Sequence, residues 1–214
     1  MKLYVDEKLT DAAFGAGAGS MHDILYGDIK SLVPVGMVVK SIYINGEKYN
    51  DLMLSADKSK AFKLSDGDEI KITTMSQLDL VNGSMDAAAA FLKEFKTGII
   101  KITDEIRWGN SAGGFNNFSE YLKGLATFVQ IMEKISEFLK IDYNNLVYGG
   151  KSIQSYFNEL ERILSSVLST QVEQDYVMLA DIVEFELKPN IDIWGDILED
   201  IKTKINGTAN AESK

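Results

Sequence analysis

The chain has 214 residues, of which 45% are hydrophobic, and its formal net charge is −10. This composition provides a core for one large domain or two smaller ones, and it excludes a largely disordered protein. The chain contains no cysteine and a single histidine, His22. Disulfides, thiolate nucleophiles, cysteine-based zinc sites and sites that need two imidazoles are therefore excluded.

Charge and hydropathy also restrict the partners. Nucleic-acid backbones require a basic surface, so the negative charge argues against nucleic-acid binding. No apolar run reaches the roughly 18 residues that a bilayer crossing needs. Asp6 and Glu7 occupy the region where a signal peptide would be apolar. We therefore expect a cytoplasmic protein without membrane insertion.

Residues 1–76 have the pattern of a small sheet-containing domain. A strand is expected at residues 2–5, and a short helix at residues 21–32, which Pro34 would end. Asn45-Gly46 lies between two extended segments, as a type I′ hairpin turn requires. Apolar and polar residues alternate at 62–64 and again at 70–72, on either side of Asp66-Gly67. This pattern predicts a second hairpin.

This order of elements is compatible with a ubiquitin-like β-grasp arrangement, on fold analogy alone. The glycine-rich residues 15–19 superficially suggest a phosphate loop. A phosphate loop has lysine after its final glycine, whereas Ser20 and Met21 follow here. A connecting segment with Ser20 as a helix N-cap is the simpler interpretation.

Residues 77–206 have the pattern of long helices. Nine apolar residues from Leu78 to Ile106 repeat at a mean spacing of 3.5, which predicts a helix with one apolar seam. A second seam runs from Phe118 to Leu139 after a break at Gly109, Gly113 and Gly114. We expect three or four long helices packed as an antiparallel bundle, because each seam needs a partner.

A third helix is expected from Lys151, with a shift of its apolar phase by one residue at Leu168. Such a shift predicts a stutter within a continuous helix. Pro189 either ends or kinks this helix, because the apolar phase continues through Leu187, Ile191 and Trp194. Residues 207–214 are expected to form a disordered tail. The sequence thus predicts an α+β protein.

Acidic residues are concentrated near the C-terminus. Between residues 171 and 200, nine acids accompany one base, Lys188. The acids are Glu173, Asp175, Asp181, Glu184, Glu186, Asp192, Asp196, Glu199 and Asp200. This segment is a solvated face, a docking surface for a basic protein partner or a binding site for a divalent cation. It lacks the pattern of a calcium-binding loop.

The two tryptophans complete the set of interaction candidates. Trp108 lies off the seam of its helix and is the better interface candidate, whereas Trp194 lies in a seam, as core residues do. The residues predicted to bind a partner are Trp108, Asp181, Glu184, Asp192, Trp194, Asp196 and Glu199.

No catalytic nucleophile, metal set or cofactor loop is recognisable. We therefore predict a noncatalytic protein–protein interaction module without a cofactor, acting as an adaptor, an assembly factor or a partner-specific chaperone. The alternative is a small-molecule-binding protein or enzyme, with a site between the sheet domain and the bundle lined by Tyr43, Tyr49, Trp108 or Asp181. A third hypothesis is homo-oligomerisation through an uncovered seam.

Overall fold

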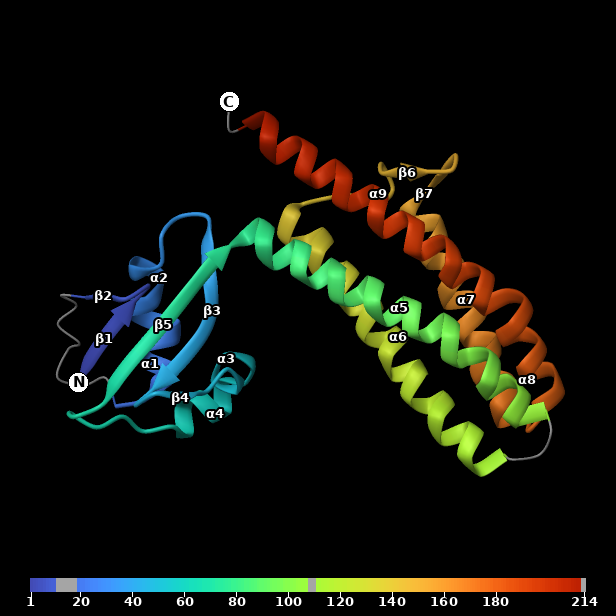
Figure 1. Cartoon of the computed structure of the whole chain (residues 1–214), viewed down its shortest axis with the longest axis horizontal. Coiled ribbons are helices and arrows are strands. Elements are labelled where there is room, and N and C mark those ends of the chain that lie inside the picture. Colours follow the sequence, from blue (N-terminus) through green and yellow to red (C-terminus); the bar gives the residue numbers. More distant parts are fainter. Residues whose placement is uncertain (11–18, 108–110, 213–214) are drawn as a thin grey trace. The chain divides into compact units, whose positions relative to one another are not determined.

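The computed structural model describes residues 1–10, 19–107 and 111–212, and the chain divides into two compact units, Met1–Leu80 and Val81–Lys214 (Figure 1). The first unit contains a five-stranded mixed sheet and the second contains the long helices. The predicted α+β class with a helical bundle is confirmed.

The first unit has the strand order β2-β1-β5-β3-β4. Its elements are β1 (Lys2–Val5), β2 (Lys8–Leu9), α1 (Met21–Asp23), the π-helix η1 (Ile24–Asp28), α2 (Ile29–Leu32), β3 (Met37–Ile44), β4 (Glu47–Lys48), α3 (Asp51–Leu54), α4 (Ala56–Ala61) and β5 (Glu69–Ser76). Strands β1 and β5 are parallel, and the other pairs are antiparallel. This order, with helical residues between β2 and β3, is that of a β-grasp fold.

The core of the first unit follows from alternation along the strands. One face of β1, β3 and β5 is buried, and it carries Leu3, Val5, Ile42, Ile44, Ile70 and Ile72. Met21 and Ile24 of the first helical segment are fully buried in the same cluster. The N–H of Ser20 donates to the Asp23 carboxylate at 3.0 Å, which fixes the start of this segment.

The first predicted hairpin is confirmed and the second is wrong. Asn45 and Gly46 both have positive φ, 52° and 87°, as a type I′ turn requires. In the predicted second hairpin, residues 62–64 follow α4 and Lys63 forms an isolated bridge with Ser20. Strand β5 pairs with β1 and β3 on its two sides. Both edges of β5 are therefore occupied, so residues 62–64 cannot pair with it.

The turn between β1 and β2 is held by a carboxylate. Asp6 accepts hydrogen bonds from the N–H of Thr74 at 2.8 Å and from its hydroxyl at 2.6 Å. These bonds favour the charged form, so they lower the pKa of Asp6.

We expect Asp6→Asn to weaken the acid sensitivity of the first unit. A carboxylate with a lowered pKa in the folded state contributes stability above its unfolded pKa, about 4, and loses that contribution as the pH decreases. The asparagine still accepts from Thr74 but does not titrate. The protection of β1 and β5 amides against hydrogen exchange, measured by NMR between roughly pH 2 and 5 and corrected for the intrinsic rate, should vary less with pH in this variant. An unchanged pH dependence would contradict the assignment.

The second unit is an antiparallel bundle of four long helical segments (Figure 1). Its elements are α5 (Gln77–Arg107), α6 (Ser111–Leu139), β6 (Val147–Tyr148), β7 (Lys151–Ser152), α7 (Ile153–Val172), α8 (Tyr176–Ile182), the π-helix η2 (Val183–Leu187) and α9 (Lys188–Glu212). The seam predicted for α5 is buried from Val81 to Ile106, and α6 buries Phe118, Leu125, Phe128, Met132 and Ile135.

The predicted stutter at Leu168 is wrong, because α7 ends at Val172. Gln174 adopts a left-handed conformation with φ 59°, and the Asp175 side chain accepts from the Met178 N–H at 3.0 Å. This capped turn leads into α8, which packs back against α7. The phase shift in the sequence therefore marks a helical hairpin and a change of direction.

Pro189 lies within a continuous helical segment. Immediately before it, η2 forms bonds that span five residues, such as that from the Lys188 N–H to the Val183 carbonyl. Of the two alternatives left open by the sequence, the continuation is therefore observed. The helix α9 also extends through Glu212, so residues 207–212 are not the disordered tail that we expected. Residues 213–214 lie outside the described part.

Trp194 is the central side chain of the bundle. It is fully buried, and its ring lies 5.3 Å from that of Phe128 on α6 and 4.4 Å from that of Phe157 on α7. The indole N–H and the amide of the buried Asn190 have no hydrogen-bond partner within the described residues. The contacts of Trp194 thus connect α9 with two other helices.

Candidate functional site

Several of the predicted interaction acids lie in ion pairs within the bundle. Arg107 at the end of α5 binds Asp181 at 2.6 Å and Glu184 at 2.8 Å. The hydrogen bonds that the Arg107 guanidinium donates to these two carboxylates, that to Asp181 first, raise the pKa of Arg107. Asp192 binds Lys96 of α5 at 2.6 Å, with Lys188 at 3.8 Å. These carboxylates therefore connect helices of this chain.

Asp196 and Glu199, further along α9, are not in ion pairs within the described residues. Burial, followed by the nearby Asp196 carboxylate, raises the pKa of Tyr148 in the short β6 strand. Glu199 is exposed, and Lys202, one turn further along the helix, is bound to Asp86. Asp196 and Glu199 thus lie at the surface, as a partner-binding role would require.

The structure places the two tryptophans differently. The fully buried side chain of Trp194 does not reach the surface, so in this structure it is a core residue and not a partner contact. Its position in an apolar seam already favoured that interpretation. Trp108, the other candidate, lies outside the described residues.

Two acids of the 171–200 segment remain at the tip of the α7–α8 hairpin. Within the described residues, neither Glu173 nor Asp175 has a lysine or arginine at ion-pair distance. Glu173 accepts from the Ser169 hydroxyl at 3.3 Å, and Asp175 caps α8. Glu186, eleven residues after Asp175, is bound to Arg162 at 2.6 Å. Within the α7–α8 hairpin, the acids without an ion pair among the described residues thus lie at the tip.

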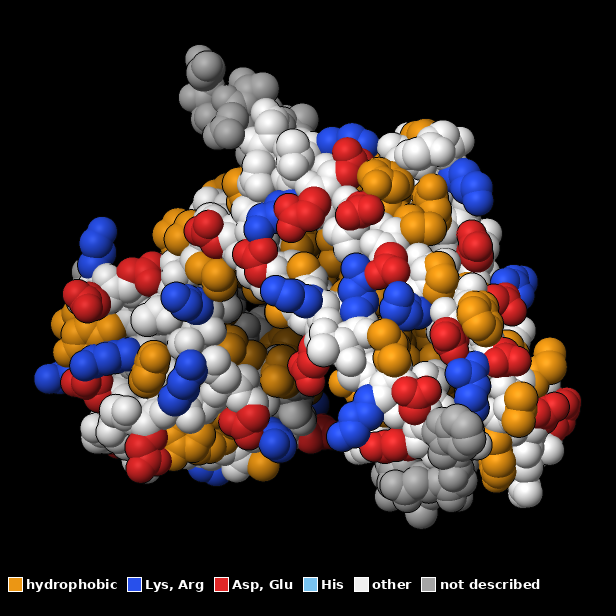
Figure 2. Space-filling view, turned by 45° about the vertical axis from the view of Figure 1, so that its right-hand side comes forward, with side chains coloured by type: hydrophobic (Ala, Val, Ile, Leu, Met, Phe, Trp, Pro, Cys, Tyr) orange, Lys and Arg blue, Asp and Glu red, His pale blue; other side chains and the backbone are white. Residues whose placement is uncertain are grey.

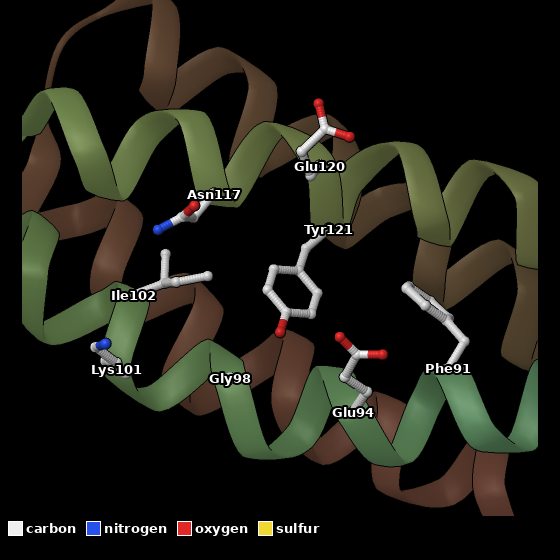
Figure 3. A pocket seen from close by; sticks show the side chains of 8 residues that line it. All are labelled: Phe91, Glu94, Gly98, Lys101, Ile102, Asn117, Glu120 and Tyr121. Carbon is white, nitrogen blue, oxygen red and sulfur yellow. The ribbon is translucent and has the colours of Figure 1, made fainter.

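A groove of about 330 Å³ lies between α5 and α6 (Figure 3). The Tyr121 side chain reaches from α6 to the backbone of Gly98 on α5, while Glu120 points away from the groove (Figure 3). The ring of Tyr121 also contacts that of Phe95 edge-on at 5.3 Å. Tyr121 thus packs one helix against the other.

A second groove, of about 480 Å³, lies between α7 and α8. Met178 and Ile182 of α8 form one wall, which is apolar, and small side chains of α7 form the opposite wall. The latter are Ser165, Ser166, Ser169 and Thr170. The Arg162–Glu186 ion pair lies at one end, and Glu173 and Asp175 lie at the tip of the hairpin.

Exposed apolar side chains are concentrated in this same hairpin. The five most exposed large apolar residues described in the second unit all belong to residues 168–185. They are Val172 (83% exposed), Phe185 (67%), Val177 (62%), Met178 (57%) and Leu168 (55%), and together they are called the hairpin surface. On the face of the second unit that Figure 2 shows, apolar side chains lie between charged ones.

The sequence contained a signal for this surface that our interpretation assigned to the core. The shifted apolar phase begins at Leu168 and includes Val172, four residues later, yet both side chains are exposed. The buried face of α7 carries Ile163, Val167 and Thr170 up to its end, and Leu168 and Val172 lie on the other side of the helix. Apolar residues out of phase with a buried face indicate a surface feature.

The residues of the alternative hypothesis lie in different surroundings. Tyr43 lines a shallow pocket of about 300 Å³ on the first unit, together with Glu7 and Lys71. The ring of Tyr49 contacts that of Phe62 edge-on at 5.2 Å, and its hydroxyl donates to Glu47 at 2.8 Å. Asp181 is bound to Arg107 in the second unit. A small-molecule site built from these residues stays a prediction.

The described residues contain no group of three or more potential metal-ligating side chains. Among the same residues, no helix combines the length and the apolar character that crossing a membrane requires.

Comparison with known proteins gives one match. No curated protein and no solved structure matches the chain. Residues 84–197, just over half of the chain and most of the helical bundle, match the family described as "Domain of unknown function (DUF8042)". The match includes α6, α7, α8 and η2, and thus both grooves and the hairpin surface. The chain therefore belongs to the family of the domain of unknown function DUF8042.

Proposed function

We propose that this protein is a noncatalytic interaction module that binds a protein partner through the hairpin surface, in the manner of an adaptor or assembly factor. The observation that carries the proposal is the exposure of Val172, Phe185, Val177, Met178 and Leu168 on one helical hairpin. Concentrated exposed apolar side chains are unfavourable in water and are typical of binding surfaces.

The surroundings of this surface also support binding. The acids of α8 and η2 that pair with Arg107 and Arg162 fix the hairpin against α5 and α7 without covering its apolar side chains. A surface on a fixed helical hairpin loses little conformational entropy on association. The cytoplasm is the compartment in which we expect this binding.

Site-specific photo-crosslinking in the native cells tests the proposal. A photoreactive amino acid at position 172 or 185 should give a discrete crosslinked complex with another protein. The same amino acid at Thr97 or Thr127, exposed positions on α5 and α6, serves as the control and should give none. A crosslink to a second copy of this chain would support homo-oligomerisation instead. The absence of any protein crosslink from 172 and 185 would contradict the proposal.

Val172→Ser with Phe185→Ser should abolish most of the crosslinking, now probed from position 178, and leave the fold unchanged. Removal of an interface anchor commonly costs more than 1 kcal/mol of binding free energy, so the affinity for the isolated partner should decrease by about tenfold or more. Because both side chains are exposed, the free energy of unfolding should change by only about 0.5 kcal/mol. Binding that survives this double substitution would exclude the hairpin surface as the interface.

A further inference from the structure

The groove between α7 and α8 is large enough to accommodate side chains of a partner. Its α7 wall consists of serine and threonine side chains. On α8, Met178 is exposed and apolar, and Ile182 is a buried residue at the base of the groove. The hydroxyl of Ser166 donates to the Arg162 carbonyl at 3.1 Å, and that of Thr170 is bonded to the Ser166 carbonyl. These hydroxyls are satisfied within their own helix, so apolar groups can lie against this wall without leaving them unpaired.

The charged side chains around the groove that have no oppositely charged partner among the described residues are negative. From Leu168 to Leu187 the hairpin contains five acids and no base. Asp181, Glu184 and Glu186 are bound to arginines of α5 and α7. Glu173 and Asp175 at the open tip are not paired with a cation within the described residues, and both line the groove. A ligand with positive charge next to apolar groups complements this arrangement.

We infer that the α7–α8 groove receives an amphipathic helix of a partner protein, with apolar side chains against Met178 and Ile182 and a lysine or arginine at Glu173 and Asp175. This inference rests on the proposed function and adds the chemistry of the partner. An apolar helix face presents side chains at i, i+3, i+4 and i+7, which is the common pattern for binding in grooves between helices.

A designed helical peptide tests the inference with the full chain. The probe contains leucines at i, i+3, i+4 and i+7 and lysines elsewhere, and a second peptide has glutamates in place of the lysines. We expect the lysine peptide to bind with a saturable fluorescence-anisotropy change at physiological ionic strength, and the glutamate peptide not to bind. Failure of the lysine peptide to bind would overturn the inference.

Charge-neutral variants separate a specific site from general attraction to an acidic protein. Glu173→Gln with Asp175→Asn removes two charges at the tip and keeps an acceptor oxygen for the α8 cap. Asp104→Asn with Glu133→Gln removes two charges from exposed positions on α5 and α6 and is the matched control. We expect the tip variant to weaken peptide binding by about three- to tenfold, in line with two exposed ion pairs, and the control to have a much smaller effect. Equal effects of the two variants would overturn the inference.

Met178→Ala distinguishes failure of this inference from failure of the proposed function. If Met178→Ala or Val172→Ser weakens binding but the tip variant does not, the hairpin surface binds a partner whose charge is unimportant, and only the inference fails. If none of the hairpin variants changes peptide binding, and positions 172 and 185 give no crosslinks in cells, both fail. Circular dichroism of each variant would confirm that the bundle is folded.

Discussion

Trp194→Ala should have the largest effect on stability of any single substitution considered for this protein. Its side chain is fully buried and lies against the rings of Phe128 and Phe157. Truncation of a core aromatic residue removes apolar burial and leaves a cavity, which together cost about 3–5 kcal/mol. Because small domains are stable by only about 5–15 kcal/mol, urea denaturation followed by far-UV circular dichroism should show a strongly destabilised bundle.

Two further variants control for other causes. Ile193→Ala changes the neighbouring residue, which is 36% exposed, and should cost about 0.5 kcal/mol. Trp194→Phe retains aromatic packing and removes an indole N–H that has no partner within the described residues, so its cost should be well below that of alanine. A Trp194→Ala protein as stable as the Ile193→Ala protein would show that the aromatic cluster is not the centre of the core.

Gly98→Ala should destabilise the bundle even though alanine is the better helix former. A Cβ at Gly98 would lie 2.8 Å from Cζ of Tyr121 and closer still to its hydroxyl oxygen. The same arrangement occurs in reverse at Gly124 on α6, where a Cβ would meet the ring of Phe91 on α5. Both rings must move to accommodate the methyl groups, and Tyr121 would lose its contact with Phe95. Such overpacking costs about 1–3 kcal/mol.

Gly83→Ala provides the matched control on the same helix. Gly83 is exposed and has nothing within 4 Å of a Cβ, so alanine should raise the free energy of unfolding by about 1 kcal/mol through helix propensity alone. Chemical denaturation of both variants gives the difference between their free energies of unfolding, which we expect to be about 1–3 kcal/mol. If Gly98→Ala stabilises the protein as much as Gly83→Ala, the close approach of Tyr121 does not constrain the pair of helices.

Much of the fold follows from local patterns. The seam from Val81 to Ile106 is buried as its spacing predicted, because apolar residues at helical spacing have one stable solution in water. Asn45-Gly46 forms the expected turn because few residue pairs adopt two positive φ values at low cost. The interpretation failed at residues 62–64, where neighbouring strands had already occupied β5, and at residues 173–175, where a capped turn reverses the chain.

The candidate site was less predictable than the fold. Counting acids between residues 171 and 200 located the charged segment but not its partners, since Arg107, Lys96 and Arg162 come from helices remote in sequence. The exposed side chains of Leu168 and Val172 had the same hydropathy as core residues. Only the packing of α7, which buries the face that carries Val167 and Thr170, shows that they face water.

The sequence by itself determined where most of the long helices and the main strands form, which face of each long helix is apolar and how much charge the chain carries. These properties depend on residues within one or two turns of each other. The tertiary structure decided which carboxylates are neutralised by remote arginines and lysines, which apolar side chains remain exposed, and that Trp194 lies in the core. Those outcomes depend on which helices become neighbours, because an ion pair and a buried surface each require two partners brought together by the fold.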